Sequence, residues 1–189
     1  MKLGDLMYQV NTTRKKGRSL VRPIDTYVVV DIETTGLSPE SDDVIEIGAI
    51  KVINNEIVDE FSKLIRIERP LSPFITNLTG ITDDMLAGGE DPDVVLRAFD
   101  EFLGDHIIIG HNVNFDINFL YDKFERYLEK PLCNDFLDTM RIARRQVKDL
   151  KNYKLGTLAE HFQIDYRGAH RGLTDVMITY HVYNQMRSM

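Results

Sequence analysis

Strand-like runs of hydrophobic residues dominate the first part of the chain. Residues 27–32 are β-branched and almost wholly apolar, which is typical of a central strand that is covered on both faces. Two further strand-like runs, residues 44–53 and 56–67, flank Asn54-Asn55, a pair that tolerates the left-handed backbone of a tight hairpin turn. We therefore predict a three-stranded antiparallel unit.

Helical and strand-like patterns alternate along the rest of the chain. Asp91 and Pro92 suit the start of a helix that stops at Gly104, and an apolar stripe from Phe115 to Leu128 marks a second helix. The elements predicted after residue 67 are a loop over 70–80, a short helix to Leu86, a helix over 91–104, a strand over 106–110, a helix from Asn114 to Pro131, a strand over 134–138 and helices at about 139–147, 155–162 and 173–186. This order predicts an α/β domain of three layers, with a mixed sheet of about five strands flanked by helices.

The first 24 residues differ in character from the rest. They lack a clear apolar period, and residues 13–18 form a basic stretch before Pro23, so we predict that residues 1–24 are a mobile basic arm. Residues 25–189 then form one domain, which agrees with a chain of 189 residues of which 43% are apolar.

Composition excludes several classes of protein. No run approaches the ~18 to 20 consecutive apolar residues that a membrane span needs, and the polar, basic N-terminal residues do not resemble a signal peptide. Cys133 is the only cysteine, which excludes an internal disulfide and a multi-cysteine zinc site. We predict a soluble, cytoplasmic protein with no membrane partner.

The net charge of −7 is distributed unevenly along the chain. Residues 1–24 hold six basic residues and one acidic residue, residues 140–172 hold eight and three, and residues 25–139 hold eight and twenty-five. An acidic centre with basic margins suits cations at the centre and a polyanion along the margins, although charge alone favours an ordinary solvated acidic protein.

Two acidic residues stand together at the end of the first strand-like run. Asp31 and Glu33 are two apart, so their side chains project from the same face of the strand, and Gly36 ends the strand nearby. Mg²⁺ and Mn²⁺ prefer such hard oxygen ligands. The pair alone is weak evidence, because a chain with thirty acidic residues contains such pairs by chance.

Three more candidates lie far from this pair in the sequence. Asp116 and Asp175 each fall in the first turn of a predicted helix, and His170 precedes Asp175 by five residues. Each has an ordinary explanation, because acids favour the positive end of a helix dipole and a histidine at such a junction commonly caps or hydrogen-bonds. The order and context of the whole set therefore have to carry the argument.

Three segments together resemble the three motifs of the DEDDh 3′–5′ exonucleases, a DnaQ-like family. They are Asp31-Ile32-Glu33-Thr34-Thr35-Gly36-Leu37, then His111-Asn112 with Phe115-Asp116 and Phe119-Leu120, and then His170 with Asp175. The similarity runs from about Tyr27 to the C-terminal helix and includes residues 78–82. It looks closest to the proofreading exonuclease domain of PolC-type bacterial DNA polymerase III and to epsilon-type subunits.

The resemblance implies an RNase H-like fold and a two-metal-ion site. Asp31, Glu33, Asp116 and Asp175 are expected to bind two divalent ions, Mg²⁺ or Mn²⁺, and His170 is expected to be the general base. An imidazole with a pKa near neutrality can take a proton from the water that attacks the terminal phosphodiester. Two ions about 3.5 to 4 Å apart hold the attacking and leaving oxygens, and a nucleoside 5′-monophosphate is the expected product.

The resemblance also implies which residues touch the substrate. The implied substrate-binding residues are Thr34, Thr35, Gly36, Leu37, Asn112 and Phe115. Leu37 is expected to wedge against the base of the terminal nucleotide. A related branch of the family has tyrosine at the position of Arg171, so this chain resembles the histidine branch.

Three functions are open on this basis. The first is a 3′–5′ exonuclease on DNA, acting in proofreading or repair, and the role of a separate editing subunit of a DNA polymerase is compatible with it. The second is a 3′–5′ exoribonuclease that trims RNA ends; related oligoribonucleases usually carry methionine where Thr34 stands, which favours DNA. The third is a catalytically idle module that binds a partner, and the retention of all four acids and the histidine argues against it.

Overall fold

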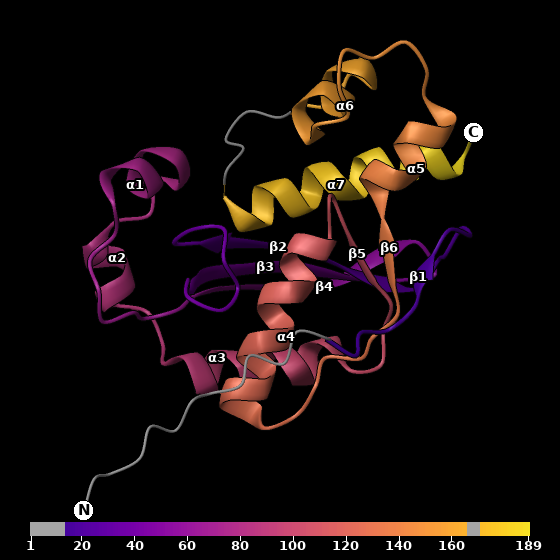
Figure 1. The fold of residues 1–189 in the computed structure, drawn as a ribbon. Helices are drawn as coiled ribbons and strands as arrows, with labels where there is room; N and C mark the ends of the chain where they lie inside the picture. Colours follow the sequence, from indigo (N-terminus) through magenta and orange to yellow (C-terminus); the bar gives the residue numbers. More distant parts are fainter. Residues whose placement is uncertain (1–13, 166–170) are drawn as a thin grey trace, which may run out of the picture.

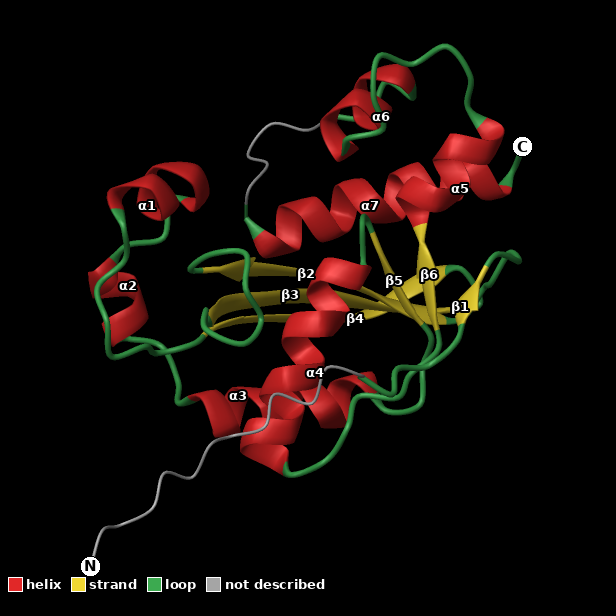
Figure 2. Ribbon diagram, viewed as in Figure 1, coloured by secondary structure: helices red, strands yellow, loops and turns green. Residues whose placement is uncertain are grey.

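A mixed sheet of six strands forms the middle of the molecule in the computed structural model, which describes residues 14–165 and 171–189 (Figure 1 and Figure 2). The strands are β1 (Ser19–Leu20), β2 (Tyr27–Thr34), β3 (Val44–Ile53), β4 (Glu56–Leu64), β5 (Ile108–Gly110) and β6 (Phe136–Asp138), in the order β1-β6-β5-β2-β3-β4. The β2-β3 and β3-β4 pairs are antiparallel, whereas β2-β5, β5-β6 and β6-β1 are parallel. The predicted three-layer α/β class is confirmed, with six strands in place of about five.

Helices cover both faces of this sheet. They are α1 (Pro73–Thr79), α2 (Asp83–Ala87), α3 (Pro92–Leu103), α4 (Asn114–Leu128), α5 (Thr139–Gln146), α6 (Leu155–His161) and α7 (Gly172–Arg187). Figure 1 shows α7 and α5 over one face, with α6 outside α7, and α3 and α4 over the other, while α1 and α2 stand beyond one end of the sheet. None of the helices described is long and apolar enough to cross a membrane.

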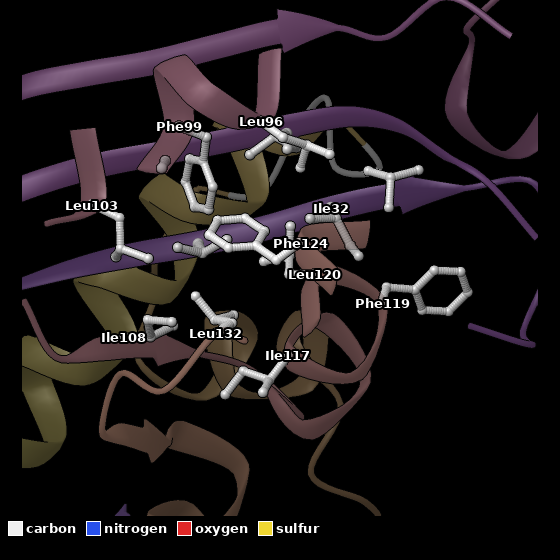
Figure 3. Close-up of a cluster of buried hydrophobic side chains, with 14 of the residues drawn as sticks. Ile32, Leu96, Phe99, Leu103, Ile108, Ile117, Phe119, Leu120, Phe124 and Leu132 are labelled. Atoms are coloured by element: carbon white, nitrogen blue, oxygen red, sulfur yellow. The ribbon is translucent and has the colours of Figure 1, made fainter. Parts of the chain in front are cut away.

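The alternation of side chains along β2 divides the core between the two layers. Val28, Val30 and Ile32 pack in the cluster that includes α3 and α4, part of which Figure 3 shows, whereas Tyr27 and Val29 pack in the cluster under α7. Burying a side chain of this size stabilises a fold by ~1.5 to 3 kcal/mol, so both layers are held firmly against the sheet. The residues of β2 that share the alternation of Tyr27 and Val29 therefore face α7.

The hairpin between β3 and β4 forms as predicted. Asn54 and Asn55 both take left-handed backbone conformations, with φ of 51° and 70°. Two successive residues of this kind match the right-handed twist of the strands that they join. β4 ends at Leu64, earlier than the predicted residue 67, and Ile65 forms an isolated bridge with Glu90.

The predicted loop over residues 70–80 was wrong, because α1 lies within it. Pro73 occupies the start of the helix, where its missing N–H costs nothing, and the Ser72 side chain accepts a hydrogen bond from Ile75 N–H at 3.3 Å. Gly80, with φ of 72°, closes the helix in the left-handed conformation. Proline and glycine, which interrupt a long helix, can equally well mark the two ends of a short one.

Residues 14–24, which the sequence assigned to a mobile basic arm, lie against the domain. Nε and Nη2 of Arg14 donate to the Asp122 carboxylate of α4 at 2.6 and 2.7 Å. Gly17 passes so close to Asn134 that an added Cβ would lie 2.2 Å from the Asn134 carbonyl oxygen. The same segment contributes β1, whose parallel pairing with β6 supplies the sixth strand.

Candidate active site

The end of β2 brings three carboxylates together. Asp31 and Glu33 project toward α7, in line with the alternation of β2, and Asp175 lies in the first turn of α7. One carboxylate oxygen from each of the three residues lies within 4.8 Å of the other two. Asp31 and Glu33 are half-buried and Asp175 is buried, so the three carboxylates are partly shielded from solvent.

A contact between two glycines sets the position of Asp175. Gly48 on β3 lies opposite Asp31 in the sheet, and Gly172 at the start of α7 packs directly on it. A Cβ added to Gly48 would lie 2.3 Å from the carbonyl carbon of Gly172, so only glycine permits this approach. Because α7 begins so close to the sheet, its first turn brings Asp175 to the two acids of β2.

Asp116 approaches the same strand from α4, on the other side of the sheet. It is 4% exposed, and its Oδ1 accepts a hydrogen bond from Ile32 N–H at 3.2 Å. Ile32 lies between Asp31 and Glu33 in the chain, so this bond holds the fourth predicted acid beside the other three. Asp116 is not in the group of three whose oxygens converge, but its charge contributes to the raised pKa of Asp31.

Burial and mutual repulsion raise the pKa values of these acids. Burial is the largest cause for Asp31, followed by the charges of Asp116 and Asp175, and the pKa of Asp31 lies well above its usual value. Burial and the charge of Asp175 raise the pKa of Glu33 to about 7. Burial also raises the pKa of Asp116 to about 8, although backbone hydrogen bonds lower it. Such a group of acids favours the binding of protons or cations.

The donor set fits a hard divalent cation. The convergent ligands are all carboxylate oxygens, which Mg²⁺ and Mn²⁺ prefer to nitrogen or sulfur. A bound cation would also offset the repulsion that raises the pKa values of Asp31 and Glu33. Asp31, Glu33 and Asp175 can therefore hold a metal ion, and Asp116 lies beside them.

His170, the predicted general base, lies outside the residues that the structure describes. The two residues that follow it are held in place by a buried acid of β3, Glu46. The Glu46 carboxylate accepts hydrogen bonds from Gly172 N–H at 3.1 Å and from Nη2 of Arg171 at 3.3 Å. The start of α7 is thus tied to the strand that lies next to Asp31 and Glu33.

The predicted substrate segment forms a tight turn after β2. Thr34 is buried and its hydroxyl donates to the Gly36 carbonyl at 2.6 Å, while the Thr35 hydroxyl accepts from Asp43 N–H at 2.9 Å. Both hydroxyls therefore hold the turn. Leu37 is 84% exposed, so this apolar side chain is available to a ligand.

The other two predicted substrate residues are Asn112, which lies just before α4, and Phe115, which lies in its first turn. Asn112 is exposed and has a left-handed backbone, with φ of 61°, and its N–H donates to Asp138 at 3.0 Å. Phe115 is half-buried and its ring lies 4.9 Å from that of Phe119. Phe115 directly precedes Asp116 in the sequence, and Asn112 precedes Asp116 by four residues.

Sequence reasoning missed two residues around the site. Glu46 is 2% exposed, and the signal that marks it is a lone acid among the apolar residues of 44–50. Arg69 donates to the Thr35 hydroxyl at 2.6 Å and to Asp43 at 3.1 Å, so it braces the turn that follows β2. No local pattern marks Arg69, because its partners lie far away in the sequence.

Comparison with known proteins covers most of the chain. The family model described as Exonuclease matches residues 28–183. The PolC-type DNA polymerase III of Caldanaerobacter subterraneus is 42% identical over 160 residues, and that of Bacillus subtilis is 41% identical over 163 residues. These alignments cover 85% and 86% of this chain but 11% of each polymerase, so the chain corresponds to a small part of those proteins.

Solved exonuclease structures share the fold. Escherichia coli exonuclease I in complex with a dT13 oligonucleotide superposes with a TM-score of 0.76 at 19% identity, over 87% of this chain and 41% of that one. Exonuclease X in complex with 5′ overhanging duplex DNA superposes with a TM-score of 0.70 at 26% identity, over 86% and 91%. The segments that resemble the DEDDh motifs all lie within the matched residues 28–183. The chain therefore belongs to the exonuclease family, in its DnaQ-like DEDDh branch.

Proposed function

We propose that this chain removes nucleotides from the 3′ end of a DNA strand by metal-dependent hydrolysis of the terminal phosphodiester. The convergence of Asp31, Glu33 and Asp175 beside the buried Asp116, in a member of the exonuclease family, is the observation that carries the proposal. A group of four acids repels a polyanion unless cations are bound to it, so DNA binding would depend on cation binding.

Each acidic residue has a defined role in this proposal. Asp31, Glu33, Asp116 and Asp175 would hold two divalent ions, Mg²⁺ or Mn²⁺, which would neutralise the negative charge that develops at the phosphodiester during hydrolysis. His170 accepts the proton of the attacking water as the water oxygen bonds to phosphorus, while the 3′ oxygen leaves with the bonding electrons and takes up a proton to become a hydroxyl. The products are a nucleoside 5′-monophosphate and a strand that is one nucleotide shorter.

The turn after β2 and the start of α4 supply the contacts to the terminal nucleotide. Leu37 packs against its base, while the backbone of Thr34–Gly36 lies along its sugar and phosphate. Phe115 of α4 and Asn112, just before that helix, border the same nucleotide. The exposure of Leu37 and Asn112 in the protein supports this assignment, because a side chain that is already packed cannot contact a ligand.

DNA is the proposed substrate, and editing beside a DNA polymerase in the cytoplasm is the proposed context. The relatives at about 40% identity are DNA polymerase III proteins, and the two solved structures are complexes with DNA. Trimming of RNA ends is the competing activity. The two activities differ in whether the site tolerates a 2′-hydroxyl on the terminal sugar.

Cleavage of matched strands tests the proposal directly. Purified protein is incubated with 5′-labelled single-stranded DNA and RNA of the same sequence, in Mg²⁺, in Mn²⁺ and in excess chelator. We expect a ladder that shortens from the 3′ end only with metal, and faster on DNA. Faster trimming of RNA would reassign the substrate.

Matched substitutions identify the site in the same assay. Asp175→Asn removes one charge from the convergent acids and should abolish the ladder, since mechanisms of this type depend on metal-held geometry. Asp105→Asn makes the same chemical change at an exposed residue before β5, and it should cleave like the unmodified chain. Full cleavage by Asp175→Asn, or cleavage in chelator, would exclude the proposed site.

A further inference from the structure

Glu46 is a buried acid beside the proposed metal site, and the roles proposed so far leave it unused. It is 2% exposed and lies opposite Glu33 in the β2-β3 pairing. Its charge contributes to the raised pKa of both Asp31 and Glu33. A carboxylate that is buried among other carboxylates destabilises the fold unless its own contacts compensate.

Both oxygens of Glu46 face the start of α7. Oε2 accepts from Gly172 N–H at 3.1 Å and Oε1 accepts from the Arg171 guanidinium at 3.3 Å. Gly172 is the first residue of α7, and the N–H groups of the first helical turn have no partners within their own helix. Glu46 therefore caps α7 from the neighbouring sheet, where the positive end of the helix dipole also favours its charge.

A short series of contacts leads from this cap to Asp175. The Arg171 carbonyl, next to the capped Gly172 N–H, accepts a hydrogen bond from Asp175 N–H at 3.1 Å. The Asp175 carboxylate then meets Asp31 and Glu33. A shift of Gly172 along or away from β3 would consequently carry Asp175 out of the convergent group.

We propose that Glu46 is a positioning residue of the exonuclease site, which fixes the start of α7 so that Asp175 meets Asp31 and Glu33. It is not one of the three convergent acids, and its oxygens are occupied by residues 171 and 172. This inference rests on the proposed function, because it concerns the geometry of the same metal-binding acids. The same cap holds the two residues that directly follow His170.

Two conservative variants separate position from charge. Glu46→Gln keeps the length of the side chain and an acceptor for Gly172 N–H but removes the charge, and the half-exposed Arg171 side chain can move away. Glu46→Asp keeps the charge but is one methylene shorter, so it cannot reach Gly172 N–H from the same backbone. Positioning predicts that Glu46→Asp is impaired and that Glu46→Gln resembles the unmodified chain.

The first measurement is the binding of Mn²⁺ to the intact, DNA-free protein by titration calorimetry. We expect Glu46→Asp to weaken Mn²⁺ binding and lower kcat by ~10- to 100-fold, as is usual when the partner that orients a metal ligand is lost, with KM for DNA little changed. Raising the Mn²⁺ concentration should restore part of the kcat of Glu46→Asp. Thr179→Ala is the control for general weakening of α7, because Thr179 is buried in that helix about two turns beyond Gly172.

The outcomes distinguish this inference from the proposed function. Unchanged Mn²⁺ binding by Glu46→Asp overturns the positioning role, as does a loss in Glu46→Gln that exceeds the loss in Glu46→Asp. An equal loss in Thr179→Ala also overturns it, since helix stability would then explain the effect. If the unmodified chain binds Mn²⁺ but cleaves neither DNA nor RNA, the proposed function fails, and the binding comparison still decides the role of Glu46.

Discussion

Asp116 has opposing effects on folding and on the proposed chemistry. Its carboxylate is almost fully buried, and burial raises its pKa to about 8. Ionisation of Asp116 adds negative charge beside Asp31, Glu33 and Asp175, which costs stability in the absence of a cation. Two-metal catalysis needs that same charge to hold the ions. Residues that serve the activity of a protein in this way commonly lower its stability.

We predict that Asp116→Asn stabilises the protein and inactivates it. At about pH 9, above the raised pKa, the native residue is ionised, so the amide removes a repulsive charge while its oxygen can still accept Ile32 N–H. Thermal unfolding in chelator should give a higher Tm for the variant, together with loss of cleavage in Mg²⁺. Asp105→Asn should change neither property. A lower Tm for Asp116→Asn in chelator would contradict this account of the site.

At the scale of elements, α7 and the turn after β2 are the two parts that must be held in place. α7 is held by the contact of Gly172 with Gly48 and by the hydrogen bonds of Glu46. The turn after β2 is held by cations from three separate parts of the chain, which are Arg14, Arg69 and Lys123. In both cases residues from distant parts of the chain fix the geometry of a short functional segment.

We predict that Gly48→Ala displaces α7. The new methyl group would lie 2.3 Å from the Gly172 carbonyl carbon, so the helix must move, and overpacking of this kind typically costs ~1 to 3 kcal/mol. Urea unfolding should show the loss, and kcat should fall because Asp175 moves with α7. Gly88→Ala is the matched control, since its Cβ would come no closer than 3.5 Å to any neighbour. An unchanged kcat in Gly48→Ala would show that the position of α7 does not control the activity of the site.

Arg14 joins the turn after β2 to α4, and we predict that Arg14→Gln weakens substrate binding. Its guanidinium donates to Glu40 at 2.7 Å and to Asp122 at 2.6 Å, and Glu40 lies just after the exposed Leu37. Loss of this link should raise KM for single-stranded DNA more than it lowers kcat, with little effect on stability because partly exposed ion pairs contribute at most ~1 kcal/mol. Arg18→Gln, which removes a pairing with Asp135, is the control. An equal KM in both variants would exclude this role.

At the scale of the whole molecule, the acidic residues of the site make the stability of the fold depend on pH and on the binding of metal ions. In the folded protein the pKa of Glu33 is raised to about 7 and that of Asp116 to about 8. Both residues therefore keep their protons to a higher pH in the folded state than in the unfolded chain. The folded state therefore binds more protons above the unfolded pKa values, and stability falls as pH rises through this range. His111, whose pKa is lowered by burial, acts in the opposite direction only in the more acidic range.

We therefore predict that the Tm in chelator decreases between about pH 6.5 and about pH 8.5. Mg²⁺ should raise the Tm, and the increase should be larger at the higher pH because the ion binds the ionised carboxylates. Thermal scans with and without Mg²⁺ at both pH values provide the measurement. An equal increase in Tm with Mg²⁺ at both pH values would mean that ionisation of these carboxylates does not control the binding of the ion.

Much of the fold and of the site follows from local patterns. The apolar run of residues 27–32 predicted a central strand, Asn54-Asn55 predicted a left-handed hairpin, and both are confirmed. The α/β class and the exonuclease family were also predicted correctly. The loop over residues 70–80 was wrong, because proline and glycine mark both the ends of short helices and loops. The roles of the four acids and of His170 stay predictions.

The sequence by itself determined which chemical groups are present and which of them share a face. Alternation along β2 is enough to direct Asp31 and Glu33 to one side, since the period of a strand is a local property. Only the tertiary structure decided what meets them: Asp175 arrives because Gly172 can approach Gly48, and Glu46 caps that helix. Such contacts depend on the packing of segments far apart in the chain, and packing leaves no periodic signal in the sequence.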